Sequence, residues 1–223
     1  MRFSIIIPTL NEERCLAGTL AHLRQQRPRE IIVVDGGSTD GTPDRAAGAD
    51  KLLRGPRGRA AQMNLGAAHA TGDVLLFLHA DCTLDPGALA AAERAVRPPR
   101  VAAGCFQMYV TGGPRYRSIA WGASARVRLT GVVYGDQGLF LRREMFERVG
   151  GFPPLKLMED IFISRALRRR GRVVVLPQRI YVSPRRWQRV GLMRQTLRNW
   201  VLTGLAIAGV HPDRLAAYYP DVR

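Results

Sequence analysis

Residues 73–82 read DVLLFLHADC, and they join an apolar run to two chemically active side chains. The apolar run follows Gly72 and has the length of a buried strand. Its end delivers His79 and Asp81. Because residues two apart lie on one face of an extended chain, we expect the imidazole and the carboxylate to point the same way. The stretch therefore predicts a buried strand with a ligand site at its end.

Strand and helix patterns alternate before this stretch. Residues 3–8 (FSIIIP) and 30–34 (EIIVV) are continuous apolar runs, typical of strands in a sheet that is covered on both faces. A helical pattern spans residues 12–25, with Asn11 as its expected N-cap, and another spans residues 58–70. The alternation predicts an α/β fold with an open, mostly parallel sheet flanked by helices.

The second half of the chain is less regular but shows no linker, internal repeat or low-complexity segment. We therefore expect one domain over residues 1–223. Its predicted strands span residues 101–111, 138–141 and 173–176, and its predicted helices span residues 118–129, 143–149, 159–170 and 186–210.

The chain is strongly basic. It has a net charge of +16, and only Lys51 and Lys156 among its 34 basic residues are lysines. Such an arginine excess reflects either a compositional bias or an anionic partner, such as a nucleotide, a nucleic acid or an acidic lipid. Because the sequence has no nucleic-acid recognition motif and no aromatic stacking platform, we expect no nucleic-acid partner.

The sequence also predicts a compartment. No signal pattern follows the first residue, and no apolar stretch reaches the ~20 residues of a transmembrane helix. The three cysteines, Cys15, Cys82 and Cys105, fit no zinc spacing and are expected to stay reduced. These features predict a cytoplasmic protein.

Two polar loops follow the first two predicted strands. Residues 8–13 (PTLNEE) and 34–42 (VDGGSTDGT) would each be ordinary loops alone. In open α/β sheets, however, ligands bind beyond the carboxyl ends of the strands. There Asp35 could accept hydrogen bonds from a base or a ribose, and Gly36 would let the backbone approach the ligand. Neither G-x-G-x-x-G nor a P-loop is present, which argues against a dinucleotide or P-loop site.

A carboxylate at the end of a buried strand suits a hard divalent cation that also binds diphosphate oxygens. Magnesium would use Asp81 and other oxygen ligands, whereas manganese would tolerate His79; the alternative for His79 is packing near the surface. Arg59 opens a predicted helix, where a cation is slightly disfavoured, so it is either a phosphate contact or a solvated arginine. Asn64 on the same helix could be a packing contact.

Glu159 and Asp160 open another predicted helix. Negative charge is favourable at a helix N-terminus, which explains the pair without any chemistry. The alternative is a general base that takes a proton from an attacking hydroxyl. Adjacent helical side chains point about 100° apart, so we expect only one of the two to face a pocket.

Five stretches together resemble one family. SIIIPTLNE, EIIVVDGGSTDGT, GRAAQMNLGAAHATGDVLLFLHAD, GDQGLFLRREMFERVGGFP and MEDIFISRALRRRG occur in the order and spacing of the family-two inverting glycosyltransferases with a GT-A fold. The resemblance covers roughly residues 3–176. It implies a single GT-A domain in which residues 1–100 hold a nucleotide sugar, residues 101–180 hold the acceptor and the base, and residues 181–223 form a C-terminal helical extension.

The resemblance also implies residue roles. It places Asp160 at the catalytic base, with Glu159 beside it, and Asp81 at the second carboxylate of an Asp-x-Asp metal motif. The metal would be Mn²⁺ or Mg²⁺, with His79 as a further candidate ligand. The residues implied in donor binding are Pro8, Thr9, Asn11, Glu12, Asp35, Gly36, Ser38, Arg59, Asn64, His79, Ala80, Arg185 and Arg186.

The chain departs from the family pattern at the metal and base positions. The family usually has aspartate where His79 stands, and often an acid where Cys82 or Gly36 stands. The first change leaves the metal motif with one carboxylate, and the last removes an acid expected near the base of the nucleotide. Shorter, bacterial members carry HAD in this position, and this chain looks most like them.

The C-terminal stretch 183–210 lies beyond the resemblance. Its apolar positions, Val190, Met193, Leu197, Val201 and Leu205, predict one face of a helix packed on the domain. The alternative is a peripheral contact with anionic lipid at the inner face of the membrane, made by arginines beside Trp187 and Trp200. Related enzymes place basic residues after the last strand over the diphosphate, which implies that role for Arg185 and Arg186.

These features predict inverting transfer of a sugar from a UDP- or GDP-linked donor to a hydroxyl acceptor, which a lipid could carry. A divalent cation and arginine would stabilise the leaving diphosphate. Two other classes of protein fit the sequence less well. A nucleotidyltransferase that makes the activated sugar would need a glycine-rich loop after the first strand, and PTLNEE has no glycine. A basic nucleic-acid-binding protein would need a recognition motif, which is missing.

Overall fold

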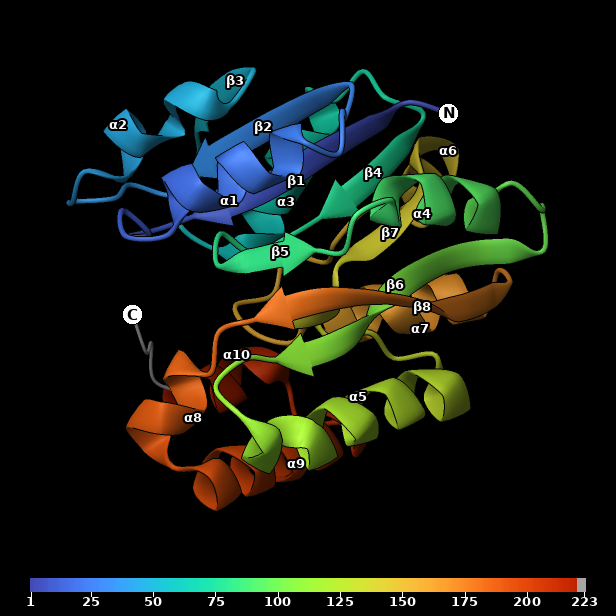
Figure 1. The fold of residues 1–223 in the computed structure, drawn as a ribbon. Coiled ribbons are helices and arrows are strands. Elements are labelled where there is room, and N and C mark those ends of the chain that lie inside the picture. The colour runs from blue at the N-terminus through green and yellow to red at the C-terminus, as the bar shows by residue number, and fades with distance from the viewer. Residues whose placement is uncertain (220–223) are drawn as a thin grey trace.

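The computed structural model describes residues 1–219, apart from the side chains of Arg186 and Ile207. Within that range eight strands form one sheet in the order β3-β2-β1-β4-β7-β6-β8-β5 (Figure 1). The strands are β1 (Phe3–Thr9), β2 (Glu30–Asp35), β3 (Lys51–Arg54), β4 (Val74–Phe77), β5 (Cys82–Leu84), β6 (Val101–Val110), β7 (Leu139–Arg142) and β8 (Arg172–Val182).

Helices precede or follow most strands. The α-helices are α1 (Leu16–Arg24), α2 (Thr42–Arg45), α3 (Arg59–Ala68), α4 (Ala88–Val96), α5 (Arg117–Thr130), α6 (Arg143–Arg148), α7 (Glu159–Arg168), α8 (Arg185–Val190), α9 (Leu192–Ile207) and α10 (Pro212–Leu215). Four single turns of 3₁₀-helix are η1 (Ala46–Gly48), η2 (Pro114–Tyr116), η3 (Gly135–Gln137) and η4 (Ala216–Tyr218).

The N-terminal half of the sheet is parallel. Strand β1 lies between β2 and β4 and is parallel to both, and β3 continues the parallel set beyond β2. Thr9 at the end of β1 is in register with Asp35 at the end of β2. The polar loops that follow these two strands therefore leave the sheet side by side, as the sequence predicted.

The C-terminal half adds antiparallel strands. Strand β7 is antiparallel to both β4 and β6, β8 is parallel to β6, and β5 is antiparallel to β8 at the sheet edge. The sheet is thus mixed, with parallel pairs in the majority. The predicted α/β fold with helices on both faces is confirmed.

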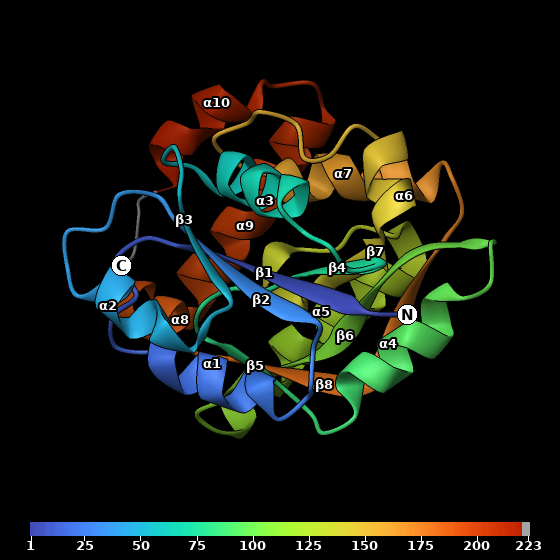
Figure 2. The same ribbon diagram turned by 90° about the horizontal axis from the view of Figure 1, so that it is seen from above.

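Side chains alternate between two core layers along the strands. Ile5 and Ile7 of β1 pack with α1 and α4 on one face, whereas Ile6 packs with α3, α6 and α7 on the other. Figure 2 shows these two groups of helices on opposite sides of the sheet. Because both faces are covered, the inner strands read as continuous apolar runs.

A smaller apolar cluster holds the C-terminal helices. Ile161 of α7 packs with Leu202 and Ala206 of α9 and with Leu215 of α10. This cluster places α9 over the start of α7, so the C-terminal helices form a wall close to the acidic pair that opens α7.

The structure corrects the start of the first helix. Helix α1 begins at Leu16, with Cys15 as its N-cap, and not at Glu12. Asn11 lies four residues before that N-cap and has a φ of 55°, in the left-handed region. The predicted capping role of Asn11 is therefore wrong.

Three elements differ from the predictions for physical reasons. Strand β5 is only three residues long, too short for a periodic pattern, and neither it nor α4 was predicted. Strand β8 runs on to Val182 through Pro177, a residue that normally interrupts a strand. The register shifts at this point: Phe106 of β6 pairs with Leu176 and the next residue, Gln107, pairs with Arg179, so Pro177 and Gln178 of β8 stay outside the ladder.

The predicted helix 186–210 is two helices, α8 and α9, separated at Gly191, which has a φ of 94°. Its apolar face was predicted to pack on the domain, and this is wrong. The residues of α9 that are buried are Gln195, Leu202 and Ala206. The exposed ones include Met193, Leu197, Trp200, Val201 and Leu205.

Candidate active site

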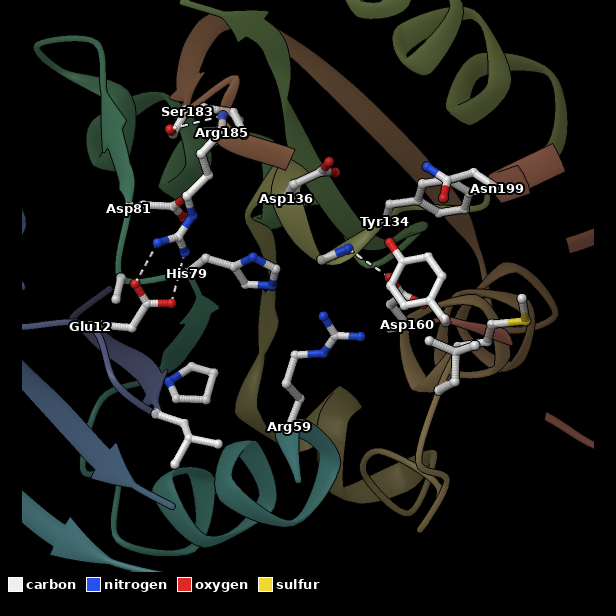
Figure 3. Close-up of a pocket in the computed structure, with 18 of the residues that line it drawn as sticks. Glu12, Arg59, His79, Asp81, Tyr134, Asp136, Asp160, Ser183, Arg185 and Asn199 are labelled. Carbon is white, nitrogen blue, oxygen red and sulfur yellow. Dashed lines mark hydrogen bonds and ion pairs between the residues drawn. The ribbon is translucent and has the colours of Figure 1, made fainter. Parts of the chain in front are cut away.

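A pocket opens at the carboxyl ends of β1 and β4, facing the C-terminal helices (Figure 3). Its lining residues come from both halves of the chain. They are Pro8, Thr9, Leu10, Glu12, Arg59, Gln62, His79, Ala80, Asp81, Tyr134, Gly135, Asp136, Leu157, Met158, Asp160, Ile161, Val182, Ser183, Arg185, Trp187, Asn199, Leu202, Thr203 and Tyr219.

Arg185 binds two acids on one side of this pocket. Its terminal nitrogens Nη1 and Nη2 donate to the two carboxylate oxygens of Glu12 over 2.9 Å and 2.7 Å. Its Nε lies 3.1 Å from Oδ2 of Asp81. Burial raises the pKa of Asp81 and the positive charge of Arg185 opposes that rise. One guanidinium from the start of α8 thus holds the two carboxylates that follow β1 and β4.

A second arginine binds one acid on the opposite side. Nε of Arg59, at the start of α3, lies 2.8 Å from Oε1 of Glu159. The Glu159 side chain is 3 % exposed, and its Oε2 has no hydrogen-bond partner among the described residues. Burial raises the pKa of Glu159, and Arg59 opposes that rise. The role of Arg59 in this structure is therefore an ion pair and not a solvated surface position.

Asp160 lines the pocket beside that pair. Its Oδ2 accepts a 2.7 Å hydrogen bond from the backbone N–H of Gly135, and its Oδ1 accepts one of 2.8 Å from the N–H of Ile161. The start of α7 thus directs Glu159 toward Arg59 and Asp160 toward the cavity. This is the division expected for adjacent residues on a helix.

His79 and Asp81 do not point the same way. The N–H of Cys82 donates to the carbonyl of His79, so residues 79–82 form a turn and not an extended strand. Figure 3 shows the His79 ring directed toward the centre of the pocket, while Asp81 faces Arg185. The ring lies close to Gly135, where a Cβ atom would come within 2.8 Å of Nε2. The expectation that both side chains share one face is wrong.

The donor-loop residues are engaged with each other. Asp35 accepts hydrogen bonds from the N–H groups of Gly37 and Ser38, at 3.1 Å and 3.0 Å. Asn11 accepts one of 2.9 Å from the N–H of Thr39 and donates its own N–H to the Ser38 hydroxyl over 2.9 Å. These contacts fix the shape of the loop after β2 and its position against the loop after β1.

Gln62 is a buried residue that the sequence did not single out. Its amide donates to the carbonyls of Thr9 and Val34, at 2.8 Å and 2.7 Å, which joins α3 to the ends of β1 and β2. A Cβ atom on Gly36 would lie 2.9 Å from the Gln62 amide nitrogen. The glycine after Asp35 is therefore required for this packing, apart from any ligand contact.

The far wall of the pocket comes from the C-terminal helices and the loop before β7. The Tyr134 hydroxyl lies 2.9 Å from the Thr203 hydroxyl of α9, and the Arg126 guanidinium stacks on the Tyr134 ring at 3.4 Å from its centroid. Burial raises the pKa of Tyr134. The stretch GDQG could have drawn attention to Gly135 and Asp136, but nothing in the sequence of α9 marked its pocket-lining residues.

A known family matches the part of the chain that holds the first strands and their polar loops. The family model described as "Glycosyl transferase family 2" matches residues 4–151. The chain belongs to glycosyl transferase family 2. The family is an inverting one, and the resemblance inferred from the five sequence stretches is confirmed at this level.

Curated relatives of this glycosyltransferase match over short segments. A PGL/p-HBAD biosynthesis glycosyltransferase of Mycobacterium tuberculosis is 41% identical over 92 residues, covering 37% of this chain and 36% of the relative. An uncharacterized glycosyltransferase of the same organism is 37% identical over 102 residues, covering 42% of this chain and 39% of that protein. The matched segments thus span well under half the length of these relatives.

Solved glycosyltransferases share the fold. The Pyrobaculum calidifontis mannosyltransferase PcManGT, in complex with GDP-Man and Mn²⁺, aligns with a TM-score of 0.65 and 26% identity, covering 81% of this chain and 56% of its own. Staphylococcus aureus TarS in complex with UDP-GlcNAc aligns with a TM-score of 0.64 and 21% identity, covering 82% and 58%. The predicted GT-A fold is therefore confirmed.

This member of glycosyl transferase family 2 gathers most, but not all, of the predicted site residues at its pocket. Those that line it are Pro8, Thr9, Glu12, Arg59, His79, Ala80, Asp81, Asp160 and Arg185. Those that do not are Asn11, Asp35, Gly36, Ser38, Asn64 and Glu159. Asn64 instead bonds the backbone of Phe152, at 2.8 Å and 2.9 Å. The side chain of Arg186 lies outside the described part of the chain.

No helix within residues 1–219 is long and apolar enough to cross a membrane.

Proposed function

We propose that this enzyme transfers a glycosyl group from a nucleoside-diphosphate sugar to a hydroxyl, with Asp160 as the general base. The observation that carries the proposal is the placement of Asp160 in the pocket while its neighbour Glu159 is paired with Arg59. The hydroxyl would lose its proton to Asp160 as its oxygen attacks the anomeric carbon from the face opposite the diphosphate, which inverts the configuration.

The backbone supports the base function of Asp160. Each carboxylate oxygen accepts one amide hydrogen, from Gly135 or from Ile161, and retains a lone pair for an incoming hydroxyl. Two fixed donors restrict rotation of the carboxylate, so it is already oriented toward the cavity before a substrate binds. Such preorganisation is what a proton acceptor needs.

The leaving diphosphate would be stabilised by arginine. Arg185 and Arg59 both line the pocket. Arg185 belongs to the C-terminal half and pairs with Glu12 of the N-terminal half, whereas Arg59 belongs to the N-terminal half and pairs with Glu159 of the C-terminal half. Fixed positive charge at the developing diphosphate lowers the barrier to departure of the nucleotide. We therefore infer that the diphosphate lies between Asp81 and Asp160, on the side of the pocket that Arg185 borders.

A divalent cation is compatible with this arrangement under one condition. Within residues 1–219 no three His, Cys, Asp or Glu side chains are grouped to hold a metal. Asp81 and Glu12 offer carboxylate oxygens, which hard cations prefer, but both carboxylates are paired with Arg185. A cation could bind Asp81 only if Arg185 moved away from it and if diphosphate oxygens supplied the remaining ligands. Bound there, Mn²⁺ or Mg²⁺ would neutralise charge on the diphosphate.

The neighbours support the choice of donor class and of metal. PcManGT was solved with GDP-Man and Mn²⁺, TarS with UDP-GlcNAc, and a third neighbour, GalNAc-T7, with UDP, GalNAc and Mn²⁺. We propose a UDP- or GDP-linked donor held by residues 1–100. The hydroxyl acceptor would be held by residues 101–180 together with the C-terminal helical extension of residues 181–223, within one domain. The HAD sequence at 79–81 would then form a one-carboxylate version of the metal motif.

The proposal is tested by a thermal-shift panel of nucleoside diphosphates and nucleotide sugars, each with and without Mn²⁺. A ligand at 100 times its Kd should raise the unfolding free energy by about 2.7 kcal/mol. We expect ligands built on one particular nucleotide to raise the unfolding free energy, and ligands built on the other nucleotides not to do so. The rise should be larger with Mn²⁺ than without it. Equal, small shifts for all nucleotides, abolished by salt, would indicate non-specific binding to a basic surface and contradict the proposal.

A further inference from the structure

The outer face of α9 is an apolar surface that no other part of the described chain covers. Its side chains remain largely exposed, from 40% for Leu205 through 64% for Leu197 and 70% for Trp200 to 83% for Met193. The inner face of the same helix buries Gln195, Leu202 and Ala206. A helix on the surface of a globular protein normally buries its apolar side. Helix α9 does bury Leu202 and Ala206, but it also exposes a row of large apolar side chains on its outer face, and such a row is the mark of a partner surface.

Helix α5, at the same end of the molecule, exposes two further apolar side chains. Trp121 is 75% exposed and Leu129 is 81% exposed. Figure 1 shows α5 and α9 together at the end of the molecule farthest from β2 and β3. We define the docking face as Met193, Leu197, Trp200, Val201 and Leu205 of α9 with Trp121 and Leu129 of α5.

The helices around the docking face carry positive charge and no negative charge. Helices α5, α8 and α9 contain no aspartate or glutamate. Arg117 and Arg128 of α5, Arg189 of α8 and Arg194 of α9 are exposed. A second copy of a chain with net charge +16 would bring these arginines against each other. An anionic lipid surface instead complements both the arginines and the apolar side chains.

We propose that the docking face binds the surface of an anionic lipid bilayer, with α9 lying in the interfacial plane. Tryptophan and leucine would enter the boundary between headgroups and acyl chains, and the arginines would meet lipid phosphates. The inner side of α9 contributes Asn199 and Thr203 to the pocket wall. Docking would therefore bring the pocket within one helix diameter, roughly 10 Å, of the headgroups. The docking itself does not depend on the proposed reaction.

The test is co-sedimentation of the full chain with vesicles of phosphatidylcholine, alone or mixed with phosphatidylglycerol. Because a protein of this charge would bind anionic vesicles weakly in any orientation, the decisive comparison keeps the charge constant. We expect the double variant Leu197→Ser, Trp200→Ser to partition roughly tenfold or more less well than the wild type into the mixed vesicles. Leu52→Ser removes an equally apolar side chain, 42% exposed, from β3 at the other end of the molecule and should bind like the wild type.

Two further measurements complete the test. Arg194→Gln should lower partitioning roughly fivefold, whereas Arg148→Gln on α6 should not. Brominated lipids should quench tryptophan fluorescence in the wild type, and much of that quenching should be lost in Trp200→Phe. Equal binding of the double variant and Leu52→Ser would overturn the proposal. A dimer in sedimentation velocity that the double variant dissociates, without vesicle binding by the wild type, would overturn it in favour of a second copy.

Discussion

Two arginines form ion pairs between the two halves of the chain at the pocket, and they differ in how many acids they bind. Arg185, from the C-terminal half, holds both Glu12 and Asp81 of the N-terminal half. Arg59, from the N-terminal half, holds Glu159 of the C-terminal half and leaves Asp160 to the backbone. The first arrangement neutralises a pair of carboxylates. The second divides a pair, and the acid without a guanidinium at hydrogen-bond distance is the one placed to accept a proton.

The comparison teaches that the ion pairs decide the roles, and the acids by themselves do not. Both acidic groups lie at the ends of regular elements in a basic chain, and both line or border the same pocket. An acid bound bidentately to arginine is a poor proton acceptor, because protonation would give up a charge-assisted interaction. Substitutions on each side of the pocket can therefore separate the role of Arg185 from that of Arg59.

Asp160→Asn should have the largest effect. The amide keeps the size of the side chain but cannot accept the acceptor proton, so turnover should fall by roughly 10²–10⁴-fold with donor affinity nearly unchanged. Donor hydrolysis by water serves as the assay, with calorimetry for affinity. Glu159→Gln is the matched control and should lose less turnover. If Glu159→Gln is inactive while Asp160→Asn turns over normally, the roles are reversed.

Arg185→Met should lower turnover, because Arg185 is proposed to stabilise the leaving diphosphate. Removing a fixed positive charge at the leaving group typically costs about 10²–10³-fold in turnover. The pH profile gives a second readout. Burial raises the pKa of Asp81 and Arg185 opposes this, so its loss should raise that pKa further. Mn²⁺-dependent nucleotide binding requires the carboxylate, is lost as pH falls through its pKa, and should therefore be lost at a higher pH in the variant.

Arg148→Met is the control for that experiment, because it removes an exposed arginine from α6, outside the pocket lining. Its turnover should match the wild type, and so should the pH at which it loses Mn²⁺-dependent nucleotide binding. Calorimetry at several pH values measures where this binding is lost. If Arg185→Met lost it at the same pH as the wild type, Asp81 would not carry the metal-dependent binding.

Arg59→Met should lower stability in addition to any loss of turnover. It leaves the buried Glu159 carboxylate uncompensated, which costs roughly 3–5 kcal/mol of unfolding free energy. Burial raises the pKa of Glu159 in the folded state above its unfolded value, so this loss should be small at low pH and grow as pH rises through the folded pKa. Urea unfolding at several pH values measures it. The double variant Arg59→Met, Glu159→Gln should be more stable at neutral pH than Arg59→Met alone; the reverse order would contradict a neutralising role for Arg59.

The sequence predicted the sheet well because strands buried on both faces leave continuous apolar runs, and it predicted the pocket because parallel strands end at one edge. It could not predict the arginine partners. Arg185 and Glu12 are 173 residues apart, and Arg59 and Glu159 are 100 apart, so no local pattern connects them. For α9, periodicity identified an apolar face but not its direction, since a pattern of side chains does not say which side meets the protein.

His79 shows the same limit at short range and gives the smallest expected effect. Counting along an extended strand placed its ring beside Asp81, but a turn at residues 79–82 directs it toward Gly135 instead. We propose that His79 packs at the pocket wall and does not bind the cation. His79→Asp should therefore leave the ratio of nucleotide Kd values in Mn²⁺ and Mg²⁺ within about twofold of the wild type.

Calorimetry in each metal measures that ratio, with Asp81→Asn as the control that should lose the metal dependence altogether. A ligand exchange from imidazole to carboxylate would instead favour magnesium, because magnesium prefers oxygen donors. A clear shift toward Mg²⁺ in His79→Asp would thus show that the ring turns back to Asp81 when the cation binds. It would also mean that the side of the pocket held by Arg185 rearranges when the cation binds.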